Sequence, residues 1–284
     1  MMHLLTLGHG YTAQALARRV IAAGGTVTGT TRTPDQAERL RAEGWDVQVW
    51  PGVDLAPLLA RASHVLVSMA PGEAGDPLLA AARDSFRGIA PDWIGYLSTT
   101  AVYGDHGGGW VSEDTPLAPS TRRGHQRVAA ERDWRALAEA EGLALTVFRL
   151  AGIYGPGRGP FEKVREGTAR RILKPGQVFS RIHVEDIASV LMASIRAGDR
   201  DGVYNVCDDD PAPPQDVIAH AAALLGLPLP PAVDFATAEM TPMARSFYME
   251  NKRVRNDRMK ALGVTLAYPT YREGLAALLA AEPG

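Results

Sequence analysis

The chain opens with His3-Leu4-Leu5-Thr6-Leu7-Gly8-His9-Gly10-Tyr11-Thr12-Ala13, a short apolar run that ends in a turn of the form G-x-G-x-x-A. The residues that follow, Tyr11 to Ala23, have helical apolar spacing, and Thr26 to Thr30 is β-branched and typical of a strand. Strand, glycine turn, helix and strand make a βαβ unit. Such a unit implies two parallel strands joined by a right-handed crossover.

The same alternation continues through the first half of the chain. It predicts strands at 47–50, 64–69, 93–98 and 143–150, and helices at 55–62, 78–87 and 126–141. The fold class is therefore α/β, a doubly wound parallel sheet of the Rossmann type, with its dinucleotide-binding core over residues 1–150. The more Gly- and Pro-rich residues 151–284 are predicted to complete the sheet within 178–207 and to form a smaller C-terminal substrate lobe. The elements expected there are strands at 178–183 and 203–206 and a helix at 184–196.

The composition excludes several classes of protein. A net charge of −2 over 284 residues gives no electrostatic reason to expect nucleic acid or an anionic membrane as a partner. No apolar run approaches the roughly 18 residues of a membrane span. Cys207 is the only cysteine, so we expect a cytoplasmic protein in which this thiol is a small buried apolar group at a strand end. The seven histidines are scattered without the spacing of metal ligands, and no metal is expected.

The first glycine turn has the form of a phosphate-binding site. Gly8 permits the tight turn, Gly10 lets the backbone approach a pyrophosphate, and Ala13 allows the helix to pack closely on the strand. The helix that begins near Tyr11 would offer unpaired N–H groups to the phosphates, with His9 and Thr12 flanking them. A purely structural glycine turn is the alternative, and the βαβ context favours nucleotide binding.

The end of the second predicted strand indicates which nucleotide is bound. Sites for NAD usually place an Asp or Glu there, whereas this chain has Thr30-Thr31-Arg32-Thr33. The planar guanidinium of Arg32, helped by the Thr31 or Thr33 hydroxyl, would suit a 2′-phosphate. A solvated loop arginine is the alternative. We therefore expect NADP as the cofactor in preference to NAD.

Several later segments, in order along the chain, resemble the extended short-chain dehydrogenases, the NAD-dependent epimerase/dehydratase family. Together with the glycine turn they cover residues 3 to about 207. They are Tyr96-Leu97-Ser98-Thr99-Thr100-Ala101-Val102-Tyr103-Gly104, Glu113-Asp114-Thr115-Pro116-Leu117, Arg149-Leu150-Ala151-Gly152-Ile153-Tyr154-Gly155-Pro156-Gly157-Arg158, Ile182-His183-Val184-Glu185-Asp186 and Val203-Tyr204-Asn205-Val206. The tail, with Asn251-Lys252-Arg253-Val254-Arg255-Asn256, is similar to an atypical branch of that family.

The resemblance implies a catalytic Ser or Thr and a Tyr-x-x-x-Lys pair, and this chain lacks the pair. Thr99 matches the Ser/Thr position, although a strand-end threonine that satisfies a local backbone group is an alternative. Arg123 and Arg127 stand at the Tyr and Lys positions, and a guanidinium cannot act as a general base. If both arginines lie on the helix face that points into the crevice, they would suit an anionic substrate, and Arg127 would still reach the cofactor ribose. If the start of this helix is displaced, both arginines would be solvated.

Two functions follow, and the sequence leaves both open. The first is an NADP-dependent oxidoreductase or epimerase-like enzyme acting on a small substrate that is anionic or similar to a sugar nucleotide. Thr99 would orient the reacting oxygen, and water or another tyrosine, with Tyr103 the best substitute, would supply the proton. The second is a non-catalytic NADP-binding sensor or regulatory protein. A homodimer is a further expectation, because 78–87 and 126–141 occupy the positions where relatives pair.

Overall fold

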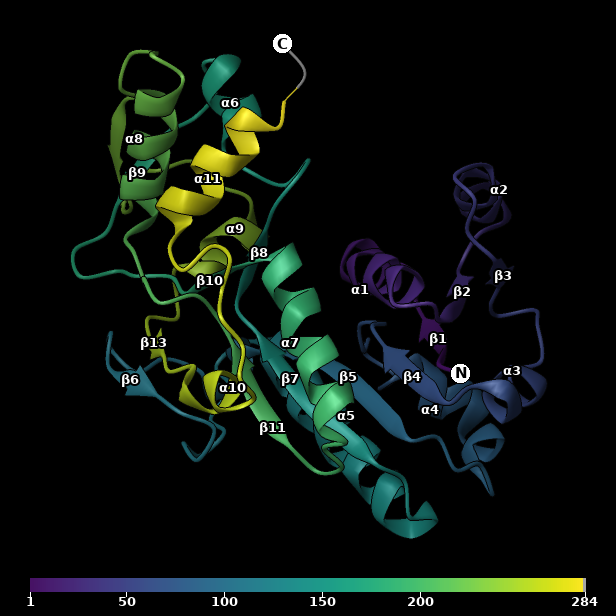
Figure 1. Ribbon diagram of the computed structural model, residues 1–284. Helices are drawn as coiled ribbons and strands as arrows, with labels where there is room; N and C mark the ends of the chain where they lie inside the picture. The colour runs from purple at the N-terminus through teal and green to yellow at the C-terminus, as the bar shows by residue number, and fades with distance from the viewer. Residues whose placement is uncertain (283–284) are drawn as a thin grey trace.

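The computed structural model describes residues 1–282, and its centre is a parallel sheet of seven strands in the order β11-β7-β5-β4-β1-β2-β3 (Figure 1). The strands are β1 His3–Leu7, β2 Thr26–Thr31, β3 Val47–Val49, β4 His64–Val67, β5 Trp93–Thr99, β7 Leu145–Leu150 and β11 Val203–Val206. From β1 the chain winds outward through β2 and β3, and then returns to β4 on the other side of β1. This reversal confirms the doubly wound Rossmann prediction and creates a crevice at the carboxyl ends of β1 and β4.

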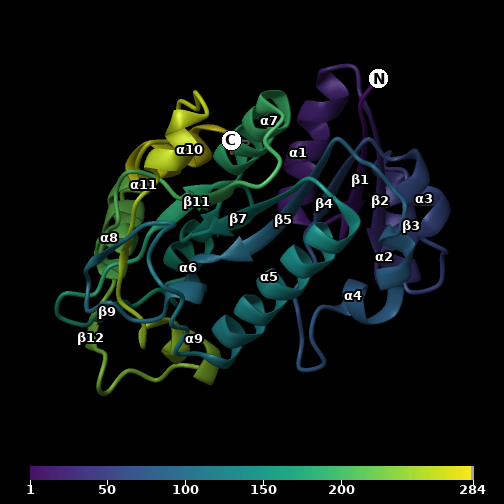
Figure 2. The same cartoon turned by 90° about the horizontal axis from the view of Figure 1, so that it is seen from below.

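Helices cover both faces of the sheet (Figure 2). One face carries α1 (Tyr11–Ala22) and α7 (Val184–Ala197), which pack against each other, and the opposite face carries α3 (Ala56–Arg61), α4 (Pro77–Ala82) and α5 (Arg122–Glu141). Alternate strand residues point to opposite faces. In β1, Leu4 therefore joins the core under α1 and α7, whereas Leu5 joins the core under α3 to α5.

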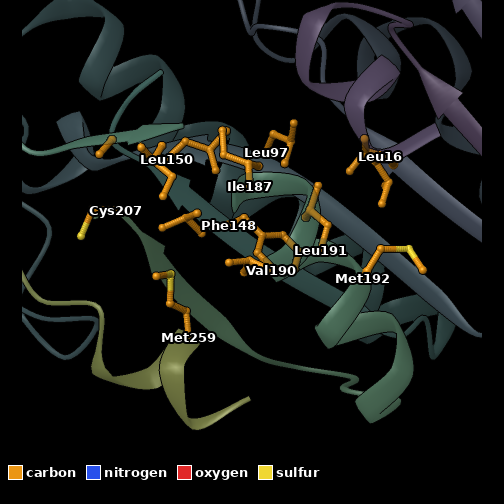
Figure 3. Close-up of a cluster of buried hydrophobic side chains, with 14 of the residues drawn as sticks. Leu16, Leu97, Phe148, Leu150, Ile187, Val190, Leu191, Met192, Cys207 and Met259 are labelled. Atoms are coloured by element: carbon orange, nitrogen blue, oxygen red, sulfur yellow. The ribbon is translucent and has the colours of Figure 1, made fainter. Parts of the chain in front are cut away.

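The core on the α7 face shows how the sheet reaches the C-terminal part of the chain (Figure 3). Phe148 and Leu150 of β7 pack there with Ile187 and Leu191 of α7. Cys207 follows β11 in the same cluster and is fully buried, as predicted. Burial raises the pKa of its thiol well above the ordinary range, so the thiol is inert.

Short elements, most of them beyond β7, lie outside the central sheet. Three two-stranded parallel sheets join distant segments: β8 Gly152–Tyr154 with β10 Arg181–His183, β9 Arg171–Leu173 with β12 Ala232–Asp234, and β6 Trp110–Val111 with β13 Arg253–Val254. The helices are α6 Phe161–Arg165, α8 Pro214–Leu224, α9 Pro242–Phe247, α10 Asp257–Ala261 and α11 Tyr271–Ala280. None of the helices formed by residues 1–282 is long and apolar enough to cross a bilayer.

The structure differs from the prediction in three elements, two that were predicted and one that was not. The strand expected at 178–183 is present only as β10 and pairs with β8 outside the central sheet, so β11 alone completes that sheet. The helix expected at 78–87 divides into α4 and a 3₁₀ turn at Arg83–Phe86. The sequence did not indicate α2 (Pro34–Ala42), because that helix buries only Ala37 and Leu40 and has a weak apolar period.

Candidate functional site

The turn after β1 is shaped to receive an anion. Gly8 has φ +95°, and its N–H donates to Thr30 Oγ1 at 3.0 Å. A Cβ at Gly10 would meet no atom within 4 Å, so the backbone there faces open space. The helix α1 begins at Tyr11 without any side-chain cap and without an acidic residue in its first turn. Its first N–H groups are therefore free to bind phosphate oxygens.

His9 contributes to this turn through its backbone, because its side chain is buried. The imidazole Nδ1 lies 2.8 Å from Thr6 Oγ1, and the ring packs edge-on against Trp45 at 4.7 Å. A Cβ at Gly29 would lie only 2.7 Å from the His9 side chain, which is too close for any contact between carbon atoms. Only a glycine therefore fits in β2 beneath the imidazole. Burial lowers the pKa of His9 to about 4, which leaves the ring neutral.

A cavity of about 270 Å³ extends from this turn to the carboxyl ends of β5 and β7. We call it the cofactor-side cavity. It is lined by Gly10, Tyr11, Thr12, Ser68, Leu97, Ser98, Thr99, Arg127, Leu150, Ala151, Ile153 and Arg158. A larger cavity of about 700 Å³ adjoins it between α6 and α11, but no residue from the ends of the central strands lines that one. Because ligands of doubly wound folds bind at the carboxyl ends of the strands, we assign the site to the smaller cavity.

The two arginines at the family's Tyr and Lys positions have different surroundings. Arg127 reaches the cofactor-side cavity, where its Nη1 donates to Tyr96 Oη at 3.0 Å and to the Leu97 carbonyl at 2.8 Å. Arg123 is exposed and lines neither the cofactor-side cavity nor the larger cavity between α6 and α11. The helix α5 begins directly before Arg123, and Thr121 caps it by accepting from the Gly124 N–H. The expected pair of inward-facing guanidiniums is thus reduced to Arg127 alone.

Arg158 is a second cation in the cavity, and the sequence reasoning did not assign it to the site. Its guanidinium carbon lies 5.0 Å from the centre of the Tyr11 ring. The Tyr11 hydroxyl donates to the Pro156 carbonyl at 3.0 Å, and a Cβ at Gly155 would lie 2.5 Å from that hydroxyl. The Gly155–Arg158 loop therefore packs directly on the start of α1, beside the glycine turn. The segment was visible in the sequence only as part of the family resemblance.

The end of β2 is the place where dinucleotide-binding folds select the nucleotide. Thr31 is buried, and its carbonyl accepts from the Trp50 N–H at 2.8 Å. Arg32 follows it and is exposed, and within residues 1–282 its guanidinium makes no hydrogen bond or ion pair. Directly after it, Thr33 caps α2 by accepting from the Gln36 N–H at 3.3 Å. The guanidinium of Arg32 is therefore free to meet a charged group bound here.

Thr99 lies where two cavities meet. Its Oγ1 accepts from the Ala101 N–H at 3.3 Å, so it satisfies a local backbone group as well as facing the crevice. The second cavity measures about 170 Å³, and we call it the substrate-side cavity. It shares Thr99 and Ala151 with the cofactor-side cavity, and its other residues are Thr100, Ala101, Gly152, Val178, Phe179, Ser180, Phe247, Glu250, Lys252 and Val254.

Tyr103 is not placed to carry a proton. It is fully buried and lines neither cavity. Its hydroxyl donates to Asn205 Oδ1 at 2.7 Å and accepts from Arg149 Nη1 at 2.9 Å. Burial also raises its pKa. The structure therefore does not support Tyr103 as the substitute for the missing tyrosine, because its hydroxyl is buried and hydrogen-bonded to Asn205 and Arg149.

Glu250 and Lys252 are the charged side chains of the substrate-side cavity, and the sequence did not indicate either of them as a site residue. The segment 251–256 was visible only as part of the resemblance to an atypical branch. No local motif marks a lone Lys two residues after a Glu as functional. The approach of this segment to β5 is a product of the tertiary fold.

The chain is similar to known proteins in both sequence and fold. A model of the NAD-dependent epimerase/dehydratase family matches residues 4–207. Protein YeeZ of Escherichia coli is 31% identical over 249 residues, which cover 81% of this chain and 86% of that protein. A conserved protein of unknown function from Silicibacter pomeroyi is 58% identical over 99% of both chains, with a TM-score of 0.90.

Two more distant structures share the fold and differ in cofactor. A UDP-glucuronic acid 4-epimerase from Bacillus cereus, solved with NAD, is 17% identical with a TM-score of 0.79, and covers 97% of this chain and 95% of its own. The human epimerase family protein SDR39U1, solved with NADPH, is 20% identical with a TM-score of 0.76, and covers 99% and 100%. At these identities the likeness establishes the architecture alone.

Proposed function

The chain belongs to the NAD-dependent epimerase/dehydratase family, and from that premise we propose that it is an NADP-dependent oxidoreductase or epimerase-like enzyme acting on a small substrate. The observation that carries the proposal is the cofactor-side cavity. It connects an uncapped helix N-terminus at Gly10 to Thr99, the residue at the family's substrate-orienting position.

The residues present fit a nicotinamide dinucleotide. Gly10 leaves the space that a pyrophosphate needs, the first N–H groups of α1 supply donors, and Arg158 adds a cation beside them. Arg127, at the family's Lys position, is available for ribose hydroxyls. When bound, the cofactor supplies a hydride donor or acceptor. Thr99 would hold the reacting oxygen at the junction of the two cavities.

A preference for NADP rests on Arg32 and on the lack of an acid at the end of β2. We expect NADPH to quench tryptophan fluorescence at lower concentration than NADH. Replacement of Arg32 with Ala should weaken NADPH binding about tenfold, close to 1.4 kcal/mol, and leave NADH binding unchanged. Arg39→Ala, an exposed arginine within α2, is the matched control. Equal affinity of the wild type for both nucleotides would refute the preference.

A non-catalytic NADP-binding sensor is the second candidate, and the exposed Arg123 at the family's Tyr position favours it. Both candidates require NADPH to bind and to raise the melting temperature. Only the enzyme consumes NADPH in the presence of a reducible substrate and slows on Thr99→Val. If NADPH neither quenches tryptophan fluorescence nor stabilises the protein, both candidates fail.

We further propose a cytoplasmic homodimer that pairs through α4 and α5, as relatives of this family do, and an anionic substrate group that Arg127 would bind. The buried, unpaired thiol of Cys207 is compatible with a reducing compartment. Size-exclusion chromatography with light scattering measures the oligomeric state directly, and a monomer at micromolar concentration would contradict the dimer.

A further inference from the structure

The substrate-side cavity contains a buried ion pair with donor capacity to spare. Glu250 is 9% exposed and Lys252 is 8% exposed. Lys252 Nζ donates to Glu250 Oε2 at 2.7 Å and to the Gly104 carbonyl at 2.7 Å. An ammonium group carries three N–H donors. Since these are the acceptors of Nζ among residues 1–282, one donor remains for a group that enters the cavity.

The backbone on both sides of Lys252 is fixed in place. The Gln177 side chain donates to the Glu250 carbonyl at 2.7 Å, and the Asn251 carbonyl accepts from the N–H groups of His106 and Gly108. One residue beyond Lys252, β13 pairs with β6. The ammonium is therefore held in position before any ligand arrives, which is a requirement of a catalytic group.

The acceptor at Gly104 is equally constrained. Gly104 has φ +74°, and a Cβ there would lie 1.9 Å from the Ala118 carbonyl oxygen. Only glycine can bring this carbonyl to Lys252 while the loop packs so closely. Gly104 ends the segment that begins with Thr99, so the same loop supplies the substrate-orienting hydroxyl and the anchor of the lysine.

A path connects this pair to solvent. Ser120 is exposed, and its hydroxyl donates to Glu250 Oε1 at 2.9 Å. The other oxygen of the same carboxylate accepts from Lys252. A proton can thus pass from water to Ser120, across the carboxylate of Glu250, and to the amine of Lys252.

We propose that Lys252 is the proton-donating residue of this site, taking the place of the tyrosine whose family position holds Arg123. Glu250 is its positioning residue, and Ser120 connects the pair to solvent. The inference rests on the proposed function as an enzyme. A buried ion pair with a purely structural role would have every donor satisfied, whereas this one opens into the cavity that Thr99 lines.

The step balances for reduction of a carbonyl compound. The carbonyl carbon gains a hydride from bound NADPH, which is oxidised to NADP⁺, and the C=O π bond breaks. The carbonyl oxygen forms an O–H bond as one N–H bond of the Lys252 ammonium breaks. The neutral amine then regains a proton from water through Ser120 and Glu250. Oxidation of an alcohol is the same sequence in reverse.

The test follows NADPH absorbance with an activated ketone, 2,2,2-trifluoroacetophenone, as the probe substrate. Lys252→Met should lower the rate of NADPH oxidation about 100-fold or more and leave NADPH binding unchanged. Lys252→Arg keeps a cation beside Glu250 but donates a proton poorly, so it should fold like the wild type and be equally slow. Lys252→Ala should regain rate on addition of ethylammonium, which can enter the vacated space. Lys163→Met, an exposed lysine of α6, is the control.

A second readout needs no turnover. The chain has four lysines, so ¹⁵N-lysine labelling gives few Nζ signals, and the one lost in Lys252→Met identifies Lys252. Addition of the ketone with NADP⁺ should shift that signal alone. An active wild type with an equally active Lys252→Arg variant, or an unmoved Lys252 signal, would overturn the role of Lys252. A wild type that binds NADPH but never oxidises it with the ketone would overturn the proposed enzyme as well.

Discussion

Two polar clusters lie side by side at the carboxyl end of the sheet and differ in whether their cations keep donors free for a ligand. The network cluster comprises Ser98, Tyr103, Glu131, Arg149 and Asn205. Arg149 there binds Glu131 in a fork, with Nε to Oε1 at 3.2 Å and Nη2 to Oε2 at 2.9 Å, and both residues are buried. The cavity cluster comprises Thr99, Arg127, Glu250 and Lys252, and each member lines a cavity.

The helix α5 supplies one charge to each cluster, one turn apart. Both oxygens of Glu131 are bonded, to Arg149, Ser98 and Arg135. Arg127 uses only Nη1 for protein groups among residues 1–282, so Nε and Nη2 remain available to a ligand. The same helix therefore contributes both to stability and to binding, and substitutions should separate the two.

The largest effect is expected in the network cluster. Glu131→Gln should lower the free energy of unfolding by about 3–5 kcal/mol, because the Arg149 charge is left buried without its counter-ion. Urea denaturation measures the loss. Glu139→Gln, an exposed glutamate of α5, should change stability by less than about 0.5 kcal/mol. Equal stability of the two variants would mean that the network cluster is not structural.

Substitution of Arg127 should weaken cofactor binding more than it lowers stability. Arg127→Met removes donors that face the cofactor-side cavity, and we expect NADPH affinity to fall about 10- to 100-fold, equivalent to roughly 1.5–3 kcal/mol. Isothermal titration calorimetry measures the affinity, and urea denaturation should show a far smaller loss of stability than Glu131→Gln. Unchanged NADPH affinity would remove Arg127 from the binding site.

The smallest effect is expected for Tyr103, which the family pattern suggested as a catalytic group. Tyr103→Phe leaves Asn205 Oδ1 and one Arg149 donor without their partner, and should cost about 1 kcal/mol of stability. NADPH oxidation with the ketone should continue at a rate within about threefold of the wild type. A hundredfold slower variant of normal stability would restore Tyr103 as the proton carrier and weaken the case for Lys252.

The sequence predicted the sheet and the glycine turn before α1 because both depend on local patterns. The apolar runs of β1, β4 and β7 are buried on both faces, and Gly8 and Gly10 lie within one turn. Placing Arg123 and Arg127 at family positions was also a local step. It could not show which of the two points inward, because that depends on how the start of α5 packs against the loop of Gly104.

The groups that the sequence missed reach the site from far along the chain. Lys252 bonds the carbonyl of a residue 148 positions earlier, and Arg158 packs on a ring in the first helix. No periodicity or spacing encodes such contacts. Tyr103 is the opposite case, a residue that the sequence suggested for the site and the structure places elsewhere. Its motif matches the family, but its hydroxyl is hydrogen-bonded to Arg149 and Asn205.

The burial of Cys207 has a practical consequence. Because the sole thiol of the chain lies under β11 and α10, a maleimide dye should leave the native protein unlabelled. Any cysteine introduced on the surface would then be the single point of attachment. Phe247 lines the substrate-side cavity and is 58% exposed, so it is a suitable position for that cysteine. A fluorophore attached there would respond when a ligand occupies the cavity, even if no reaction takes place.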